Sequence, residues 1–257
     1  GDMKVMHCGN AACTSGNVTS VADAGGNGGD NNLSRLEIAV APDGLAVISY
    51  HDSASGILKV YKCSNTNCTS GTATSVDSGG GRGMYNQIAI GTDGLPIISY
   101  QGDYGDSLKV VKCGNATCSS GNTITTLTAA TGLGAGRMND IAIGRDGLPV
   151  IMDDEAVGND IVFFKCGNAA CSSGNVKSTL LDGLLSDDPS MTIGSDGFPI
   201  MVYRASSGSL AFLKCGNADC SRGNSVSNQY WSAAAATSTI RVGSDGMPIV
   251  VTYDFST

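Results

Sequence analysis

Cysteine is the residue type in this sequence whose spacing could most directly carry chemistry. The ten cysteines form five pairs with the spacing C-x4-C: Cys8/Cys13, Cys63/Cys68, Cys113/Cys118, Cys166/Cys171 and Cys215/Cys220. Structural zinc sites usually combine C-x2-C pairs or add histidines. This chain has only two histidines, and each pair would need two further ligands. A thioredoxin-like redox centre is also disfavoured, because that motif is C-x-x-C. The pattern therefore predicts five local disulfides and an oxidising compartment, which means an extracellular, periplasmic or cell-surface protein.

Carboxylates offer a second kind of chemistry. The run Asp153-Asp154-Glu155 begins where related segments of the chain carry a tyrosine. A carboxylate that replaces a buried tyrosine is costly unless it is paired or bound. One interpretation is an acid/base group whose pKa is tuned by its neighbours. The structural alternative is an ion pair, with Asp140 or Arg204 as partner, or a solvated loop edge. The candidate catalytic residues are Asp153, Asp154, Glu155, Asp140 and Glu37.

An internal repeat indicates which elements position these residues. A segment centred on an Asp-Gly pair recurs five times, at intervals of 49 to 53 residues. Each unit contains four predicted strands, which we call A to D. Strand A precedes Asp-Gly, strand B follows it, strand C ends at the first cysteine, and strand D is rich in β-branched residues. Glycine supplies the positive φ of the A–B turn, and proline stands at the start of most B strands. Strands A and B are apolar without alternation, which predicts burial on both faces, whereas C and D are more polar.

Four antiparallel strands in about 50 residues are typical of a β-propeller blade. The end of the chain, VTYDFST, followed by its beginning, GDMKVMHC, reproduces the pattern ISYHDSASGILKVYKC of a complete unit. We therefore predict an all-β, five-bladed β-propeller of four-stranded antiparallel blades. Its ring is closed by N-terminal strands C and D pairing with C-terminal strands A and B. The predicted single domain spans 1–257, with blades at approximately 36–80, 87–130, 138–182, 190–230, and 239–257 plus 1–22.

This predicted architecture resembles two groups of propellers. One is the loosely defined sialidase-like, Asp-box-containing group of secreted bacterial propellers, and the other is the five-bladed lectins of the tachylectin type. The Asp-box pattern S-x-D-x-G-x-x-W is absent, since the C–D hairpin carries C-G-N-x-x-C and the only tryptophan is Trp231. Each predicted disulfide is thus expected to be a staple on an outer hairpin, far from the channel. The resemblance implies a fold and a site on one face of the ring, and no catalytic residue is carried over.

The variable loops indicate which face that is. The A–B and C–D turns are short and nearly alike in every unit, whereas the D–A and B–C loops differ in length and composition. Function usually lies on such variable loops. The expected ligand-binding residues are B-strand ends, A-strand starts and loop aromatics: His51, Gln101, Asp154, Arg204, Asp254, Glu37, Gln87, Asp140, Tyr85, Tyr104 and Trp231. The plain alternative is that the polar residues among them are strand ends that reach water.

Charge and composition narrow the class of partner. The net charge of -8 and the pI near 4.5 argue against nucleic acid and against anionic membrane surfaces. No apolar run approaches 18 residues, so no membrane insertion is expected. No cofactor or metal site is predicted, although the acidic loops 25–32 and 184–190 could hold calcium without an EF-hand spacing.

Three functional hypotheses remain. We favour a secreted or cell-surface binding module, a monomer that recognises carbohydrate or another small polar ligand, because ligand binding tolerates the pseudo-symmetry of similar blades. The alternative is a glycoside hydrolase with a carboxylate acid/base pair at the central channel. The third hypothesis is a structural repeat domain of a larger surface protein.

Overall fold

The protein is all-β. The computed structural model describes residues 2–24, 36–78, 83–102, 107–128, 135–155, 160–181, 189–205, 209–229 and 235–254. Within these ranges the chain forms twenty strands and no helix. None of the described residues therefore belongs to a helix that could cross a membrane.

Four complete blades each contain four antiparallel strands in chain order. The first blade consists of β3 (Leu36–Val40), β4 (Ala46–Asp52), β5 (Ile57–Cys63) and β6 (Gly71–Asp77). The second consists of β7 (Met84–Ile90), β8 (Pro96–Gly102), β9 (Ser107–Lys112) and β10 (Thr123–Thr128). The third consists of β11 (Asp140–Ile143), β12 (Pro149–Glu155), β13 (Asp160–Lys165) and β14 (Val176–Leu181). The fourth consists of β15 (Ser190–Ile193), β16 (Pro199–Arg204), β17 (Leu210–Lys214) and β18 (Ser225–Gln229).

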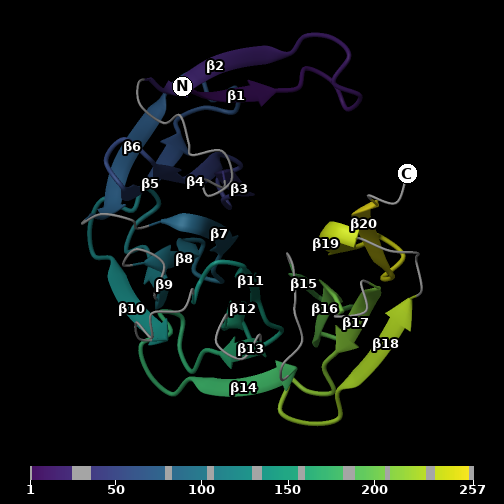
Figure 1. Cartoon of the computed structure of the whole chain (residues 1–257). Helices are drawn as coiled ribbons and strands as arrows, with labels where there is room; N and C mark the ends of the chain where they lie inside the picture. Colours follow the sequence, from purple (N-terminus) through teal and green to yellow (C-terminus); the bar gives the residue numbers. More distant parts are fainter. Residues whose placement is uncertain are drawn as a thin grey trace.

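The blades stand around an arc, with strand A of each blade toward the centre and strand D on the outside (Figure 1). The A strands of successive blades contact one another around this arc, from β3 through β7, β11 and β15 to β19. The predicted propeller of four-stranded antiparallel blades is thus confirmed.

The fifth blade is split between the two ends of the chain. Strands β1 (Met3–His7) and β2 (Val18–Asp23) are its C and D strands, and β19 (Ala235–Val242) and β20 (Pro248–Asp254) are its A and B strands. In this structure the two halves are separate two-stranded sheets on either side of an opening (Figure 1). The predicted pairing between them is therefore not present here, and each half packs on its neighbouring blade. Met3 packs with Tyr50 of the first blade, and Ile240 packs with Val202 of the fourth.

The Asp-Gly turns between strands A and B form as predicted. In the second blade Gly94 has φ +77°, which an L-residue adopts only at a cost. The backbone N–H of Leu95 donates to Oδ1 of Asp93 (3.1 Å), and the N–H of Gly91 donates to the carbonyl of Leu95 (2.9 Å). Pro96 is the first residue of β8, and prolines also begin β12, β16 and β20. Proline fits there because the first residue of a strand need not donate to the ladder.

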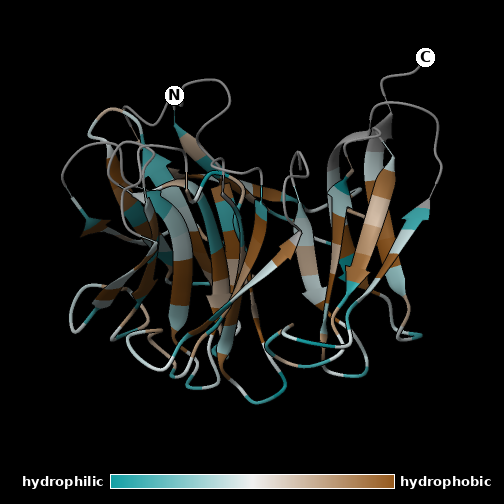
Figure 2. Ribbon diagram, turned by 60° about the horizontal axis from the view of Figure 1, so that its bottom comes forward, coloured by the Kyte–Doolittle hydropathy of each residue, from teal (hydrophilic) through white to brown (hydrophobic). Residues whose placement is uncertain are grey.

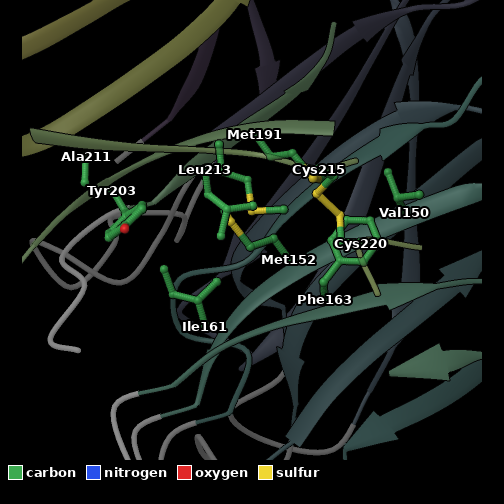
Figure 3. Close-up of a cluster of buried hydrophobic side chains, with 11 residues drawn as sticks. Val150, Met152, Ile161, Phe163, Met191, Tyr203, Ala211, Leu213, Cys215 and Cys220 are labelled. Atoms are coloured by element: carbon green, nitrogen blue, oxygen red, sulfur yellow. A yellow bond between two sulfur atoms is a disulfide. The ribbon is translucent and has the colours of Figure 1, made fainter. Parts of the chain in front are cut away.

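Most of the core lies between the facing sheets of neighbouring blades. In one cluster Val150, Met152 and Phe163 of the third blade pack against Met191 and Tyr203 of the fourth (Figure 3). Hydrophobic bands accordingly cross the middle of the strands (Figure 2). Every residue of β8 and β9 is buried, whereas the D strands β6 and β10 are mostly exposed or half-buried. The expectation that strand C is a polar outer strand is therefore wrong, because a blade on each side covers it.

The five predicted disulfides are present, with Cα–Cα distances of 4.7 to 4.9 Å. They join Cys8 to Cys13, Cys63 to Cys68, Cys113 to Cys118, Cys166 to Cys171, and Cys215 to Cys220. The expectation of a mere staple on an outer hairpin needs a correction, because four of the five disulfides are buried parts of the core. Cys68 is 2% exposed and belongs to a cluster with Met3, while Cys171 is 0% exposed and belongs to a cluster with Ile97 and Val110 of the second blade. These disulfides therefore also contribute apolar contacts between neighbouring blades.

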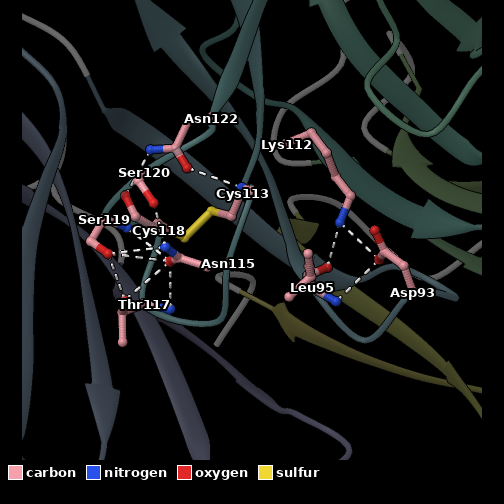
Figure 4. The surroundings of a disulfide bond; sticks show 11 residues. Asp93, Leu95, Lys112, Cys113, Asn115, Thr117, Cys118, Ser119, Ser120 and Asn122 are labelled. Atoms are coloured by element: carbon pink, nitrogen blue, oxygen red, sulfur yellow. Dashed lines mark hydrogen bonds and ion pairs between the residues drawn. A yellow bond between two sulfur atoms is a disulfide. The ribbon is translucent and has the colours of Figure 1, made fainter.

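The backbone of each disulfide hairpin has an unusual conformation that the sequence did not predict. In the second blade the N–H of Cys118 donates to the carbonyl of Asn115 (3.0 Å) and closes a tight turn (Figure 4). Cys118 has φ +52°, Cys68 and Cys171 both have φ +51°, and the second cysteines of the other two pairs have nearly the same value. This conformation is uncommon for a residue other than glycine, so the turn is held by the bonds around it.

Two asparagines and two glycines complete the same hairpin. The side-chain oxygen of Asn115 accepts hydrogen bonds from the backbone of Thr117 and Ser119, and Asn122 donates to the carbonyl of Cys118 (2.7 Å). The N–H of Gly114 donates to Asn122 (3.1 Å). A Cβ on Gly114 would lie 2.4 Å from the carbonyl oxygen of Gly121, so glycine is required for this close approach. The motif is a structural unit, with its polar groups satisfied internally.

Candidate functional site

A repeated ion pair holds the edge of the ring that carries the Asp-Gly turns and the disulfide hairpins. In the second blade Nζ of Lys112 lies 2.8 Å from Oδ1 of Asp93 and donates to the carbonyl of Leu95 at 3.0 Å (Figure 4). The other complete blades repeat it as Lys62–Asp43 at 2.8 Å, Lys165–Asp146 at 2.9 Å and Lys214–Asp196 at 2.9 Å. Sequence reasoning missed this pair, although a lysine precedes the first cysteine in all four complete blades.

These lysines hold the pKa values of their aspartates down. At Asp43 the hydrogen bond from Lys62 lowers the pKa of the carboxyl. At Asp93 burial acts to raise the pKa, and the bonds from Lys112 and from the Leu95 N–H outweigh it. Paired, ionised carboxylates of this kind stabilise the blade, and we call this side of the ring the turn edge. Functional candidates belong on the opposite side, which we call the loop edge.

At the loop edge the best-defined polar group of the first blade is a chain of charges around Lys59. Nζ of Lys59 lies 2.8 Å from Oδ2 of Asp52 and 3.4 Å from Oδ2 of Asp23. The hydroxyl of Tyr50 donates to the same oxygen of Asp23 at 2.5 Å. Burial raises the pKa of Tyr50, and the bond to Asp23 raises it further. Burial also acts to raise the pKa of Asp52, but the bonds from Lys59 and Ser55 reverse the direction and lower it.

The second blade repeats this contact. The hydroxyl of Tyr100 donates to Oδ2 of Asp77 at 2.8 Å, and Nζ of Lys109 lies 4.0 Å from the same oxygen. In both blades the tyrosine belongs to strand B, and the aspartate ends strand D of the preceding blade. Asp23 and Asp77 are not among the candidate residues predicted from the sequence. The signal that could have found them is the ending V-A-D or S-V-D of two D strands.

The third blade breaks this pattern at Asp153. Its side chain is fully buried, and both oxygens accept from the backbone N–H of Gly136, at 3.0 Å each. Thr128 pairs with Leu108 as Asp77 pairs with Leu58, so the preceding D strand ends here without a carboxylate. The third blade thus carries on its own strand B the acid that the first two blades take from a neighbour. Asp153 is therefore not at a solvated loop edge, and its described bonds go to the backbone before strand A rather than to Asp140 or Arg204. Asp154 is half-buried beside it, and the side chain of Glu155 lies outside the described part.

The A-strand starts share one register: Glu37 pairs with Ser49, Gln87 with Ser99, Asp140 with Met152, and Ser190 with Val202. Where their contacts are defined, these side chains tie one blade to the next. Oδ2 of Asp140 accepts from the N–H of Met191 (2.8 Å) and from the hydroxyl of Ser190 (3.2 Å). The hydroxyl of Ser190 in turn accepts from the N–H of Ile240 (3.4 Å).

The electrostatics of Asp140 are those of a buried acid. Burial raises the pKa of its carboxyl, while the Met191 N–H and the charge of Arg241 act in the opposite direction. A raised pKa is what a general acid requires. Both oxygens are nevertheless engaged, since the N–H of Ile141 donates to Oδ1 at 2.8 Å. The described geometry therefore fits an inter-blade tie better than a proton donor to a substrate.

Two buried asparagines form a related tie that sequence reasoning also missed. The hydroxyl of Ser49 donates to Asn86 at 2.5 Å, and the hydroxyl of Ser99 donates to Asn139 at 2.5 Å. Each bond joins strand B of one blade to the start of strand A in the next, since Asn86 lies in β7 and Asn139 immediately precedes β11. The signal was an asparagine immediately before Gln87 and before Asp140 in the segments YNQIAI and MNDIAI.

The remaining candidates lie at several places along the loop edge. His51 is buried in β4, and the amide of Gln101 donates to the carbonyl of Ala135 at 3.3 Å. Arg204 ends β16 and is half-buried. Tyr85 is buried with φ +49°, and the guanidinium of Arg137 lies 6.0 Å from its ring centroid.

Three candidates lie outside what is described: Tyr104, Trp231 and the side chain of Asp254. The register of β19 with β20 pairs Thr239 with Val251. Counting from it, Tyr253 takes the position of His51, and Asp254 lies one residue beyond the predicted row.

Among the described residues no group of three or more His, Cys, Asp or Glu side chains could hold a metal ion. The calcium prediction concerned loops 25–32 and 184–190. All of the first and most of the second lie outside the described ranges.

Solved structures share the fold. A protein of unknown function from Dyadobacter fermentans gives a TM-score of 0.60 at 10% identity, over 86% of this chain and 75% of that one. The α-L-arabinanase of Penicillium chrysogenum, solved in complex with arabinobiose, gives a TM-score of 0.60 at 10% identity, over 88% and 76%. A thermostable family-43 glycoside hydrolase gives 0.53 at 13% identity, over 88% and 84%. No known sequence family and no curated protein matches the chain. At these identities the likeness establishes the propeller fold alone.

Proposed function

We propose that this protein is a secreted or cell-surface module that binds carbohydrate at its loop edge without hydrolysing it. The observation that carries the proposal is the state of the candidate acids. Asp140 and Asp153 both accept hydrogen bonds from backbone N–H groups of the frame. A glycoside hydrolase needs two carboxyl groups aimed at one bond, about 5 Å or about 6.5–9.5 Å apart. A binding site needs only polar and aromatic groups on a rigid frame.

Two further observations support this proposal. The five disulfides fit an oxidising compartment, where many glycan-binding proteins act. Solved propellers of similar shape include an arabinanase in complex with arabinobiose, so an arabino-oligosaccharide is the first ligand to try. The ring of polar residues at the B-strand ends, which includes Asp154 and Arg204, supplies hydrogen-bonding groups of both signs for sugar hydroxyls.

A glycoside hydrolase is the second candidate, and one observation favours it. Burial raises the pKa of Asp140, which begins an inner strand, and a raised pKa is what a general acid requires. In that case the bonds from Ser190 and Met191 orient the acid, and Glu37 or Asp154 supplies the second carboxylate.

A binding screen and an activity screen separate these functions. We expect titration with arabino-oligosaccharides and a glycan array to detect binding, and a chromogenic glycoside panel to show no turnover. Arg204→Ala should weaken binding about tenfold, the effect of losing one charged hydrogen bond. Arg222→Ala is the matched control on an exposed turn-edge hairpin and should leave binding unchanged. Turnover that is lost in Asp140→Asn would establish the hydrolase instead. If neither binding nor turnover is detected, both candidate functions are contradicted and the structural repeat domain remains.

A further inference from the structure

The two ends of the arc expose apolar positions that the complete blades bury. Ile38 of β3 is 60% exposed, whereas its counterparts Ile141, Met191 and Ile240 are 7%, 2% and 0% exposed and Ile88 is half-buried. These counterparts are covered by the preceding blade, and Ile38 has only the outer half of one before it. The first blade therefore presents an unfilled interface.

The last strand presents the complementary surface. Ile249 of β20 is 60% exposed, whereas Val47, Ile97 and Val150, which occupy the same position, are 0%, 0% and 1% exposed. In the complete blades this position packs against strand A of the following blade. The exposed faces of β20 and β3 are thus the two sides of one inter-blade interface.

A hollow of about 340 Å³ marks the same gap on the fourth blade. Its lining consists of Ile200, Phe212, Lys214, Ser225, Ser227 and Pro248. Phe212 is half-buried, although Val60, Val110 and Phe163 at the same position are fully buried. Phe163 is covered by Leu213 and by the Cys215–Cys220 disulfide of the next blade (Figure 3). The hollow therefore lies where a residue like Leu213 and a disulfide hairpin are expected.

The N-terminal hairpin contains those two parts, and both are uncovered. Met6 takes the position of Leu213 and is 57% exposed, whereas Leu213 is 2% exposed. Cys8 is half-buried and Cys13 exposed, while the other eight cysteines are 0% to 2% exposed.

A hydroxyl group in the hollow also corresponds to a hydrogen-bond donor of the complete blades. Strand D of one blade donates to the hairpin of the next: Thr125 to the carbonyl of Ala170 at 3.1 Å, and Ser178 to that of Asp219 at 3.0 Å. Ser227 is the equivalent donor on the fourth blade, and it lines the hollow. The equivalent acceptor in the N-terminal hairpin is the carbonyl of Ala12.

The split blade also carries residues that could form a modified version of the repeated ion pair. The register that sets Lys214 opposite Ile200 sets His7 opposite Ile249. In each complete blade the lysine at this position contacts the aspartate of the Asp-Gly turn, which in the split blade is Asp245. The closed fifth blade would therefore join His7 to Asp245.

We propose that the hairpin 3–23 docks into the hollow of the fourth blade of its own chain and pairs β1 with β20. Met6 and the Cys8–Cys13 disulfide fill the space beside Phe212, and His7 binds Asp245. The partner is the same chain because intramolecular docking does not cost the translational freedom of a second molecule. Closure also removes the two open strand edges. This inference does not depend on the function proposed above.

Hydrogen exchange and light scattering test the proposal on the full chain. We expect a monomer in which the amides of β1 and β20 exchange as slowly as those of β9. Met6→Glu places a charge in the hollow, so it should speed exchange in β20 and lower the melting temperature. Thr19→Glu is the control, because this position of strand D is exposed in the split blade and in the complete blades alike. A dimer whose β20 is protected only by the hairpin of a second chain would overturn the proposal. Fast amide exchange in β1 and β20, together with no effect of Met6→Glu on exchange or on the melting temperature, would also overturn the proposal.

The ion pair gives an independent readout. His7→Lys installs the residue of the complete blades and should raise the melting temperature by about 2 °C, as expected for one partly exposed pair. Asp245→Asn should cancel that gain. A gain that persists in the double variant would exclude the contact between position 7 and Asp245.

Discussion

The turn edge and the loop edge of this propeller differ in how regularly their contacts repeat from blade to blade. At the turn edge the lysine–aspartate pair recurs in every complete blade, and the second to fourth blades also share the hydrogen bonds of the hairpin around Asn115. At the loop edge equivalent positions carry different residues, as Tyr50, Tyr100 and Asp153 show. The turn-edge contacts therefore follow one pattern around the ring, whereas the loop-edge contacts depend on which two blades are neighbours. Changes at the turn edge should alter stability without altering ligand binding.

The largest expected effect is the loss of a turn-edge disulfide. Removing Cys113–Cys118 by a double serine substitution should cost roughly 3 kcal/mol, because the unfolded chain gains freedom and two buried sulfurs lose their packing. Thermal unfolding should shift down by roughly 9 °C. Binding measured below the transition should be unchanged. A loss of affinity in the folded double variant would break the separation of the two edges.

Next in size is Asp153 at the loop edge. Asp153→Ala leaves the N–H of Gly136 buried without its acceptor and should cost about 2 kcal/mol in urea unfolding. Asp153→Asn keeps one acceptor oxygen and should cost less. The half-buried neighbour provides the control, and Asp154→Asn should change stability little. A variant that loses activity at full stability would instead identify Asp153 as a catalytic acid.

Gly114 at the turn edge should have a smaller effect. Gly114→Ser forces a Cβ against the carbonyl of Gly121 and should cost about 1–2 kcal/mol. The first blade already carries Ser64 at this position, together with Thr72 in place of Asn122, and there the N–H of Ser64 donates to the carbonyl of Ser70. Ser64→Gly should therefore be nearly neutral in the same unfolding assay. A Gly114→Ser variant as stable as the parent would show that the two hairpins tolerate a side chain alike.

The smallest expected effect concerns pH at the turn edge. The folded-state pKa of Asp93 is lowered by Lys112, so the pair stabilises the fold above the unfolded-state pKa, near 3.9. That contribution is lost as the pH falls through the folded-state value. Lys112→Met should cost less than about 1 kcal/mol at pH 7, because the aspartate is partly exposed. Its stability deficit against the parent should shrink by pH 3. An equal deficit at both pH values would assign the loss to packing of the lysine stem.

The sequence predicted the repeating frame because its determinants are local. An Asp-Gly pair, a proline beside it and two cysteines five residues apart each determine structure within a few residues. The buried C strands were misjudged, because Lys109 and Lys112 read as polar while their flanking residues Leu108 and Val111 pack in the core. The burial of disulfides such as Cys166–Cys171 was missed for a related reason, since the blade that covers them lies about 50 residues away in the sequence.

The candidate site was harder to predict because its contacts join blades. Successive side chains of a strand point to opposite faces, so Ile141 and Asp140 face different ways. This rule does not say whether Asp140 faces the channel or the next blade. Its partners, Ser190 and Met191, lie 50 and 51 residues away. The partner of Tyr100 lies 23 residues back, in another blade. A single sequence contains no signal that links such positions unless both halves of a pair are sought together.

The exchange of a tyrosine for Asp153 has a consequence for how such a ring could grow by duplication. A copy of the second blade inserted after itself would bring Tyr100 against Thr128, which has no carboxylate to accept its hydroxyl. The third blade placed directly after the first would bring Asp153 against Asp77, two acids at one position. Each blade thus supplies one partner of a buried polar contact that its neighbour must complete. These contacts therefore restrict the order in which the blades can follow one another.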